Sequence, residues 1–176
     1  MKFMHIGVWL LGVSLLGSAQ AQKLDDAWHG RWASPDTQLD VSAKNFRVGK
    51  QSCRWVDAPP KRAFKGCIAH YSDAFTKAQL MTFAKERAEA INEYVKINMY
   101  DAKTAAAERK SLADTRAIID KLGAAPLKPV VIQDAAYEGS GDCASSYFMD
   151  QSRVFNLLQC AGGDGSFAIT ELKKRP

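Results

Sequence analysis

The chain contains few side chains that could act as acid, base or nucleophile, and they are far apart in the sequence. Only His29 and His70 follow the apolar N-terminal segment. A serine hydrolase needs a histidine beside an activated serine and an acidic residue. No Gly-x-Ser-x-Gly motif is present, and the segment 139–142, Gly-Ser-Gly-Asp, has the composition of a turn. The pattern therefore disfavours a hydrolase that acts through His29 or His70.

Adjacent carboxylates offer a second kind of chemistry, because a glycosidase uses two carboxyl groups with different pKa values. Asp25 and Asp26 form one pair, and Glu86 and Glu89 form another. Neither pair has the apolar neighbours that would raise the pKa of one member. Both pairs are therefore interpreted as solvent-facing surface.

Metal and phosphate sites are not indicated either. His29, His70 and Asp73 would be a sparse ligand set, because they belong to separate elements. The segment 162–165, Gly-Gly-Asp-Gly, lacks the lysine and the strand-to-helix context of a phosphate-binding loop, so it predicts a turn. We expect no metal, no cofactor and no enzymatic activity.

Four cysteines, Cys53, Cys67, Cys143 and Cys160, follow the N-terminal segment, and an even number favours disulfides in an oxidising compartment. Cys53 and Cys67 are equidistant from Pro60, and the other two flank a polar turn in a similar way. We expect each pair to be joined across its own hairpin, with each loop contributing about 3 kcal/mol. Metal ligation is the alternative, but the chain has no Cys-x-x-Cys motif.

Residues 1–21 predict a signal peptide for export to the periplasm. Lys2 provides a basic start, residues 6–16 are apolar, and Ala19-Gln20-Ala21 matches a cleavage site. The apolar run is too short for a membrane span, which needs ~20 residues, and no second run of that length follows. We expect residues 22–176 to form one α+β domain that is stapled by disulfides and does not span a membrane.

The charge balance is mildly basic, with 24 Lys and Arg residues, 19 Asp and Glu residues and a net charge of +5. No dense basic stripe is present, so nucleic acid is not an expected partner. Anionic material of the cell envelope stays a candidate partner. A basic cluster beside Phe64 is either a solvated loop or a partner-binding patch. Together with two residues of the C-terminal glycine-rich turn, the candidate binding residues are Lys61, Arg62, Phe64, Lys65, Gly163 and Asp164.

An alanine-rich helical block is predicted between residues 72 and 122. Thr76 and Gln79 match a capping box, and Phe75 can pack on Leu80 as a hydrophobic staple. The residues that follow have a period of 3.6, which gives one largely apolar face. The predicted buried face of this first helix consists of Leu80, Phe83, Ala84, Arg87, Ala88, Ile91, Tyr94, Val95, Asn98 and Met99.

The apolar pattern loses register at residues 98–101, where Asp101 can cap a second helix. Gly123 closes that helix, and Pro126 prevents its continuation. Two antiparallel helices are the preferred interpretation of residues 76–122, and one long bent helix is the alternative. The predicted buried face of the second helix consists of Ala105, Leu112, Thr115, Ile119 and Leu122.

The segments on either side of the helices have the alternating pattern of β-strands. Strands are expected near residues 39–41, 46–48, 53–56, 66–71, 130–132, 143–149, 153–160 and 166–172, and residues 173–175 are expected to be a frayed tail. Trp28 and Trp32 are expected in the core. The predicted fold class is α+β, an antiparallel curved sheet or small open barrel of about seven short strands from the N- and C-terminal thirds, with the two-helix block packed on one face.

Three functions are compatible with these features. The favoured one is a periplasmic, non-enzymatic protein that binds another macromolecule, expected to be a protein of the cell envelope, as inhibitors and toxin-immunity proteins do. The second is a small-ligand or accessory binding protein with a cavity beneath the helices, which would be lined by Trp28, Trp32, Trp55 or Phe167. The third is a histidine-dependent hydrolase.

Overall fold

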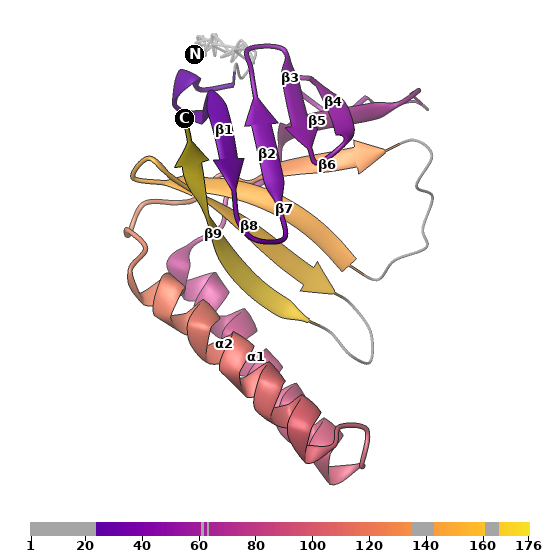
Figure 1. The fold of residues 1–176 in the computed structure, drawn as a ribbon, viewed down its shortest axis with the longest axis vertical. Coiled ribbons are helices and arrows are strands. Elements are labelled where there is room, and N and C mark those ends of the chain that lie inside the picture. The colour runs from indigo at the N-terminus through magenta and orange to yellow at the C-terminus, as the bar shows by residue number, and fades with distance from the viewer. Residues whose placement is uncertain (1–23, 61, 63, 135–142, 161–165) are drawn as a thin grey trace, which may run out of the picture.

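The computed structural model describes residues 24–60, 62, 64–134, 143–160 and 166–176, and its architecture is α+β (Figure 1). These residues form a closed barrel of nine strands and two helices that pack on its outer surface. The first strand and the end of the last strand lie at one end of the barrel, and the helices lie at the other end (Figure 1). The predicted signal peptide, residues 1–21, is outside the described residues.

The elements follow the order strands, helices, strands. A short 3-10 helix and five strands come first: η1 (Asp26–Trp28), β1 (Gly30–Ala33), β2 (Gln38–Val41), β3 (Asn45–Val48), β4 (Gln51–Trp55) and β5 (Cys67–Tyr71). The helices are α1 (Lys77–Lys96) and α2 (Ala102–Asp120). Four strands follow them: β6 (Val130–Asp134), β7 (Cys143–Asp150), β8 (Arg153–Cys160) and β9 (Phe167–Arg175).

The barrel is closed by pairing between β1 and β9, which come from opposite ends of the described chain. Arg31 pairs with Arg175 and Trp32 pairs with Lys174 in antiparallel register. The predicted open barrel of about seven strands is therefore corrected to a closed one of nine among the described residues. The prediction of a frayed tail at 173–175 is wrong, because these residues are the last part of β9. Their pairing satisfies backbone groups that an open edge would leave exposed.

One neighbouring pair of strands, β4 and β5, is parallel, with Arg54 paired to Ile68 and Trp55 to Ala69. The predicted disulfide between Cys53 and Cys67 is present, and the two Cα atoms are 4.4 Å apart. It joins parallel neighbours, however, so the prediction that it crosses a hairpin is wrong. The connection 56–66 is longer than a hairpin turn of about two to five residues. It returns the chain to the end of the sheet from which β4 started, which makes the pair parallel.

The second predicted cysteine pair lies on antiparallel strands. Cys143 of β7 is opposite Cys160 of β8 in the ladder. Cys160 is disulfide-bonded. Directly opposite residues have the Cα separation of about 5.5 Å that a disulfide requires, so this register is the one that the predicted pairing needs.

Aromatic side chains fill the described interior of the barrel. Trp28 and Trp32 are buried there, as predicted, and the indole N–H of Trp32 donates to the carbonyl oxygen of Trp28 at 2.9 Å. Phe46 packs against both Trp28 and Tyr147, with ring centroids 5.8 and 5.6 Å apart. Small barrels are generally filled by their inward side chains, and this one follows the rule.

Residues 77–120 form two helices and not one bent helix. Thr76 accepts from the amide of Gln79, and the Gln79 side chain accepts from the amide of Thr76, which confirms the predicted capping box. Asn98, just after α1, has a left-handed φ of 58°, a conformation that commonly ends a helix. Asp101 accepts from the amide of Thr104 and caps α2, as predicted.

Both helices pack on the outer surface of strands β7 to β9. The shared core contains Leu80, Ala84, Ile91, Leu112, Ile119, Phe148, Phe155, Leu157, Phe167 and Ile169. The Thr115 hydroxyl also accepts from the amide of Ile169, which ties α2 to β9. Since alternate residues of these strands face the barrel interior, the strands are covered on both faces. The predicted buried face of α2 is confirmed at all five positions.

Candidate binding site

The six residues predicted to bind a partner are only partly described. Arg62 and Lys65 are exposed and Phe64 is half-buried on the connection between β4 and β5. Lys61, Gly163 and Asp164 lie outside the described residues. The structure therefore neither brings this predicted set together nor separates it, and its role stays a prediction.

Each of the two histidines contacts a residue that is close to it in the sequence. His70 is buried, and its Nδ1 lies 2.8 Å from the carbonyl oxygen of Tyr71. Nδ1 of His29 lies 3.6 Å from a carboxylate oxygen of Asp26. Within the described part of the chain, neither histidine is hydrogen-bonded to a serine, and no three His, Cys, Asp or Glu side chains lie together as metal ligands would. The described geometry around these histidines thus offers no triad.

Exposed large apolar side chains are concentrated on α1 and the link that follows it. In the described ranges they are Met81, Phe83, Val95, Ile97 and Met99, and the last two are 54% and 55% exposed. The prediction that Phe83, Val95, Asn98 and Met99 belong to the buried face of the helix is wrong, because all four are exposed. Phe83 and Val95 are twelve residues apart in α1, which is about 18 Å along the helix axis, so the five residues form two small groups and not one continuous patch. Exposed apolar side chains of this kind are candidate contacts for a partner. We call these five residues the α1 apolar surface.

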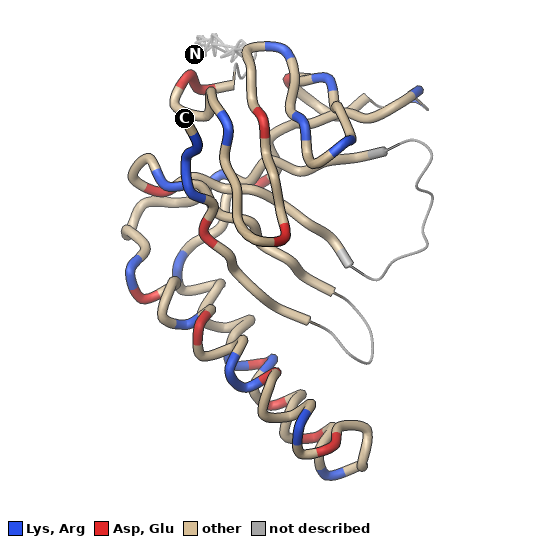
Figure 2. The backbone as a smooth tube through the Cα atoms, viewed as in Figure 1, with Lys and Arg blue, Asp and Glu red and all other residues tan. Residues whose placement is uncertain are grey.

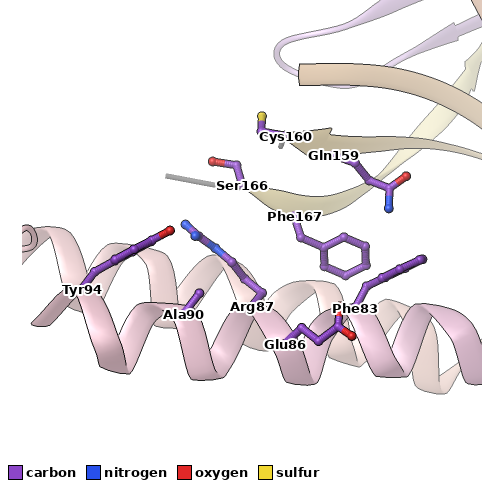
Figure 3. A pocket seen from close by; sticks show the side chains of 9 residues that line it. All are labelled: Phe83, Glu86, Arg87, Ala90, Tyr94, Gln159, Cys160, Ser166 and Phe167. Carbon is purple, nitrogen blue, oxygen red and sulfur yellow. The ribbon is translucent and has the colours of Figure 1, made fainter. Parts of the chain in front are cut away.

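A cleft of about 210 Å3 lies between α1 and the ends of β8 and β9 (Figure 3). Phe83, Ala90 and Tyr94 line it from the helix, and Gln159 and Phe167 line it from the strands. The rings of Phe83 and Phe167 are 6.0 Å apart, so Phe83 belongs both to the cleft and to the α1 apolar surface. Phe83 is the one member of the α1 apolar surface among the described residues that line the cleft.

Two charged residues, Glu86 and Arg87, line this cleft, and the Arg87 side chain is only 3% exposed. Figure 3 shows it rising from α1 towards the strands, between Tyr94 and Phe167. Its Nη2 donates both to Glu108 at 2.8 Å and to Tyr100 at 3.1 Å. Its Nη1 is buried and has no hydrogen-bond acceptor among the described residues. The wall of the cleft thus contains a buried guanidinium that is already paired with a carboxylate.

Arg87 keeps its positive charge in this environment. Burial lowers its pKa, but hydrogen bonds to Glu108 and Tyr100 oppose that effect, and the net result is a pKa above the ordinary value for arginine. The side chain therefore remains a hydrogen-bond donor only, at any pH at which the protein is folded.

A second hollow, of about 290 Å3, lies between the two helices and has a different composition. Its lining includes Asn92 of α1 and Arg109 and Arg116 of α2. Arg109 donates to the Asn92 side chain at 3.1 Å, and Arg116 donates to the carbonyl oxygen of Ala84 at 3.2 Å. Aromatic residues are absent from its described lining, but Ala88, Leu112 and Ala113 also line this hollow, and its wall is more apolar than that of the cleft.

Charges are mixed along both helices, as Figure 2 shows by the alternating blue and red segments. Exposed ion pairs join Lys85 to Glu89, Lys96 to Glu93 and Lys110 to Asp114. Each exposed pair contributes at most about 1 kcal/mol to stability. Neither helix therefore presents a large field of one sign.

The sequence pattern placed Arg87 on the buried face of α1, and that prediction is confirmed. It did not identify the cleft. One signal was available: a single arginine among apolar positions of a helix must be paired when buried, so it marks a polar site inside a core.

No family model matches the chain, and no curated protein or solved structure shows significant similarity to it. Within the described residues, neither helix is long and apolar enough to cross a membrane. The interpretation of function therefore depends on the surface and the cleft themselves.

Proposed function

We propose that this chain is a non-enzymatic, exported binding protein of the cell envelope, which acts by binding another protein as inhibitors and toxin-immunity proteins do. The α1 apolar surface is the observation that carries the proposal. Its five members are exposed to solvent although they are large and apolar. Burial of such residues against a partner stabilises a complex by about 25 cal/mol for each Å2 removed from water.

A protein partner fits the dimensions of the site better than a small ligand does. The cleft of about 210 Å3 is smaller than the roughly 300–1,000 Å3 of typical small-molecule sites. Of the four aromatic residues expected to line a ligand cavity, Trp28 and Trp32 are buried in the barrel core, and Phe167 alone lines the cleft. A cleft of this size suits one inserted side chain of a protein.

The cellular compartment in the proposal is supported by the disulfide between Cys53 and Cys67. Disulfides persist in the periplasm and outside the cell, and they are rare in the reducing cytosol. Protein inhibitors and immunity proteins of the envelope work by contact and need no catalytic groups, which agrees with the dispersed positions of His29 and His70.

The proposal is tested by capture of a partner from envelope extracts with three forms of the protein. The first is the wild type, and the second carries Phe83→Ser, Ile97→Ser and Met99→Ser. The matched control carries Ala106→Ser and Ala117→Ser, which are exposed positions on α2. The α1 variant should lose about tenfold or more in affinity, because hot-spot residues contribute 2 kcal/mol or more, while the α2 control should bind like the wild type.

The urea midpoint of each form must be measured alongside. Ile97→Ser and Met99→Ser should each change stability by no more than about 0.5 kcal/mol, whereas Phe83→Ser also removes a contact with Phe167 and should cost more. A partner that binds the α1 variant as tightly as the wild type would contradict the proposed surface. A catalytic turnover that disappears in a His29→Ala, His70→Ala variant would contradict the non-enzymatic proposal.

A further inference from the structure

The outer surface of the barrel carries a row of exposed arginines on strands that lie away from the helices. Outward side chains alternate with the buried ones of the interior, and the exposed outward positions include Arg31 of β1, Arg47 of β3, Arg54 of β4 and Arg175 of β9. The register places Arg31 opposite both Arg175 and Asp40, and it places Asp40 opposite Arg47. Arg54 lies diagonally from Arg47 on the next strand. We call these four arginines the arginine row, and Figure 2 shows blue segments on β1 and at the end of β9.

The described residues leave most of this positive charge without a counter-charge. Nε of Arg31 lies 3.8 Å from a carboxylate oxygen of Asp40, and exposed pairs of this kind are weak. The other three arginines belong to no ion pair among the described residues. Arg31 and Arg175 are directly opposite each other on neighbouring strands, and like charges in that position destabilise a sheet. An anion bound at the row would remove this repulsion.

Protection of a sheet edge does not explain the arginine row. Charged side chains on a strand commonly prevent an open edge from pairing with another chain. Here β1 pairs with both β2 and β9, and the described strands form a closed barrel. Since these strands have no open edge, the charges are available for another purpose, which is contact with an anionic partner.

The chemistry of the row favours the phosphate groups of a membrane over a protein. The planar fork of a guanidinium matches two oxygens of a phosphate group. Protein interfaces have a core enriched in aromatic residues, but the exposed large apolar side chains of the described chain lie on α1 and the link after it and not on the barrel. Lipid headgroups form a layer about 5–7 Å deep on each side of a bilayer, so side chains on a convex barrel can reach several of them.

We propose that the arginine row binds the anionic headgroups of a phospholipid membrane surface. The barrel then lies on the headgroup layer, and the helices at its other end point away from it (Figure 1). The α1 apolar surface stays accessible to a protein partner in this arrangement. The inference goes beyond the proposed function and does not depend on it, because different residues make the two contacts.

The test is flotation of the protein with phospholipid vesicles. Vesicles of equal parts phosphatidylcholine and phosphatidylglycerol should bind the protein, whereas vesicles of phosphatidylcholine alone should not. An increase in ionic strength from about 0.15 M to about 1 M shortens the Debye length from about 8 Å to about 3 Å, so it should release the protein. Inorganic phosphate at the same concentration of phosphate groups should not compete, because several contacts to one surface are stronger than single ones.

Two variants with the same loss of charge locate the effect. The first carries Arg47→Gln, Arg54→Gln and Arg175→Gln, and it should bind the mixed vesicles tenfold or more weakly, since each basic residue at an anionic surface contributes about fivefold in affinity. The matched control carries three exposed changes in and just after α2: Lys103→Gln, Lys110→Gln and Lys121→Gln. It should bind like the wild type. Circular dichroism of both variants shows whether they are folded, and the comparison of the two vesicle types needs no variant.

The proposal is overturned if the wild type binds both kinds of vesicle equally or neither kind, or if the α2 control loses as much affinity as the arginine variant. Competition by inorganic phosphate would assign the row to a soluble anion instead. Capture of an acidic protein that depends on the row, without vesicle binding, would assign it to a protein. None of these results affects the capture experiment with the α1 variant, so the two proposals fail separately.

Discussion

Helices α1 and α2 are 20 and 19 residues long and form one antiparallel hairpin, but they use their apolar residues differently. In α2, the large apolar residues are Leu112, Ile118 and Ile119, and none of them is exposed. The exposed positions of α2 are alanines, charged residues, Thr104 and Ser111. Helix α2 therefore has the composition of a helix that only covers a sheet.

Helix α1 contains more apolar area than the sheet can cover. Leu80, Ala84 and Ile91 are fully buried and serve the same purpose as their counterparts on α2. The α1 apolar surface lies outside this buried stripe and extends into the link after the helix. Figure 1 shows that the hairpin continues past the strands, so its far end has no sheet to cover.

The difference separates residues that are needed for folding from residues that are available for binding. Buried side chains of both helices stabilise the fold, whereas exposed apolar ones on α1 lower solubility without stabilising it. Substitutions of the buried residues should therefore change stability, whereas substitutions of the exposed apolar residues on α1 should change partner binding.

The largest expected effect comes from the buried set. Ile119→Ala in α2 should lower the free energy of unfolding by about 2–5 kcal/mol, because it removes a side chain that is fully buried. Ile97→Ala, the matched change at a position that is 54% exposed, should change it by no more than about 0.5 kcal/mol. Both changes in the free energy of unfolding are measured by urea unfolding, and they are comparable when the m-values of the two variants are equal. Equal losses of unfolding free energy for Ile119→Ala and Ile97→Ala would contradict the distinction between buried and exposed apolar residues.

A smaller effect should separate the two N-caps by their response to pH. Asp101, the cap of α2, has a pKa below its ordinary value because the amide and the hydroxyl of Thr104 donate to it. Its contribution to stability is therefore fully present above about pH 3.9, the value for an unfolded aspartate, and is lost as the pH falls through the lower folded pKa. Thr76, the cap of α1, does not titrate.

Urea unfolding of the wild type and of Asp101→Asn across acidic pH measures this response. Asparagine also caps helices but has no charge, so the wild type should lose stability relative to the variant only below about pH 4. Thr76→Asn is the matched control, and its difference from the wild type should stay constant with pH. A constant difference for Asp101→Asn as well would show that the carboxylate charge does not matter at this cap.

Features that depend on neighbours in the sequence could be predicted. The capping box at Thr76, the cap at Asp101 and the buried face of α2 arise within a few turns of helix, where residue spacing fixes which side chains meet. The disulfide between Cys53 and Cys67 was likewise predictable from composition and compartment.

Features that depend on contacts between distant parts of the chain could not be predicted from the sequence. The closing strands contain Arg31 and residues 173–175, whose polar side chains carry no strand pattern, and their pairing joins the two ends of the described chain. The orientation of β5 depends on the path of residues 56–66 and not on strand composition. The unused N–H of Arg87 likewise depends on where Glu108 of α2 and Tyr100 reach it in space.

The binding role of α1 is tested most directly by site-specific photo-crosslinking in living cells. A photoreactive phenylalanine analogue is placed at Phe83 on α1 or at Ala106, an exposed position on α2. The account predicts a discrete crosslinked partner from position 83 and none from position 106. A partner from position 106 alone, the same partner from both positions, or no adduct from position 83 would contradict it.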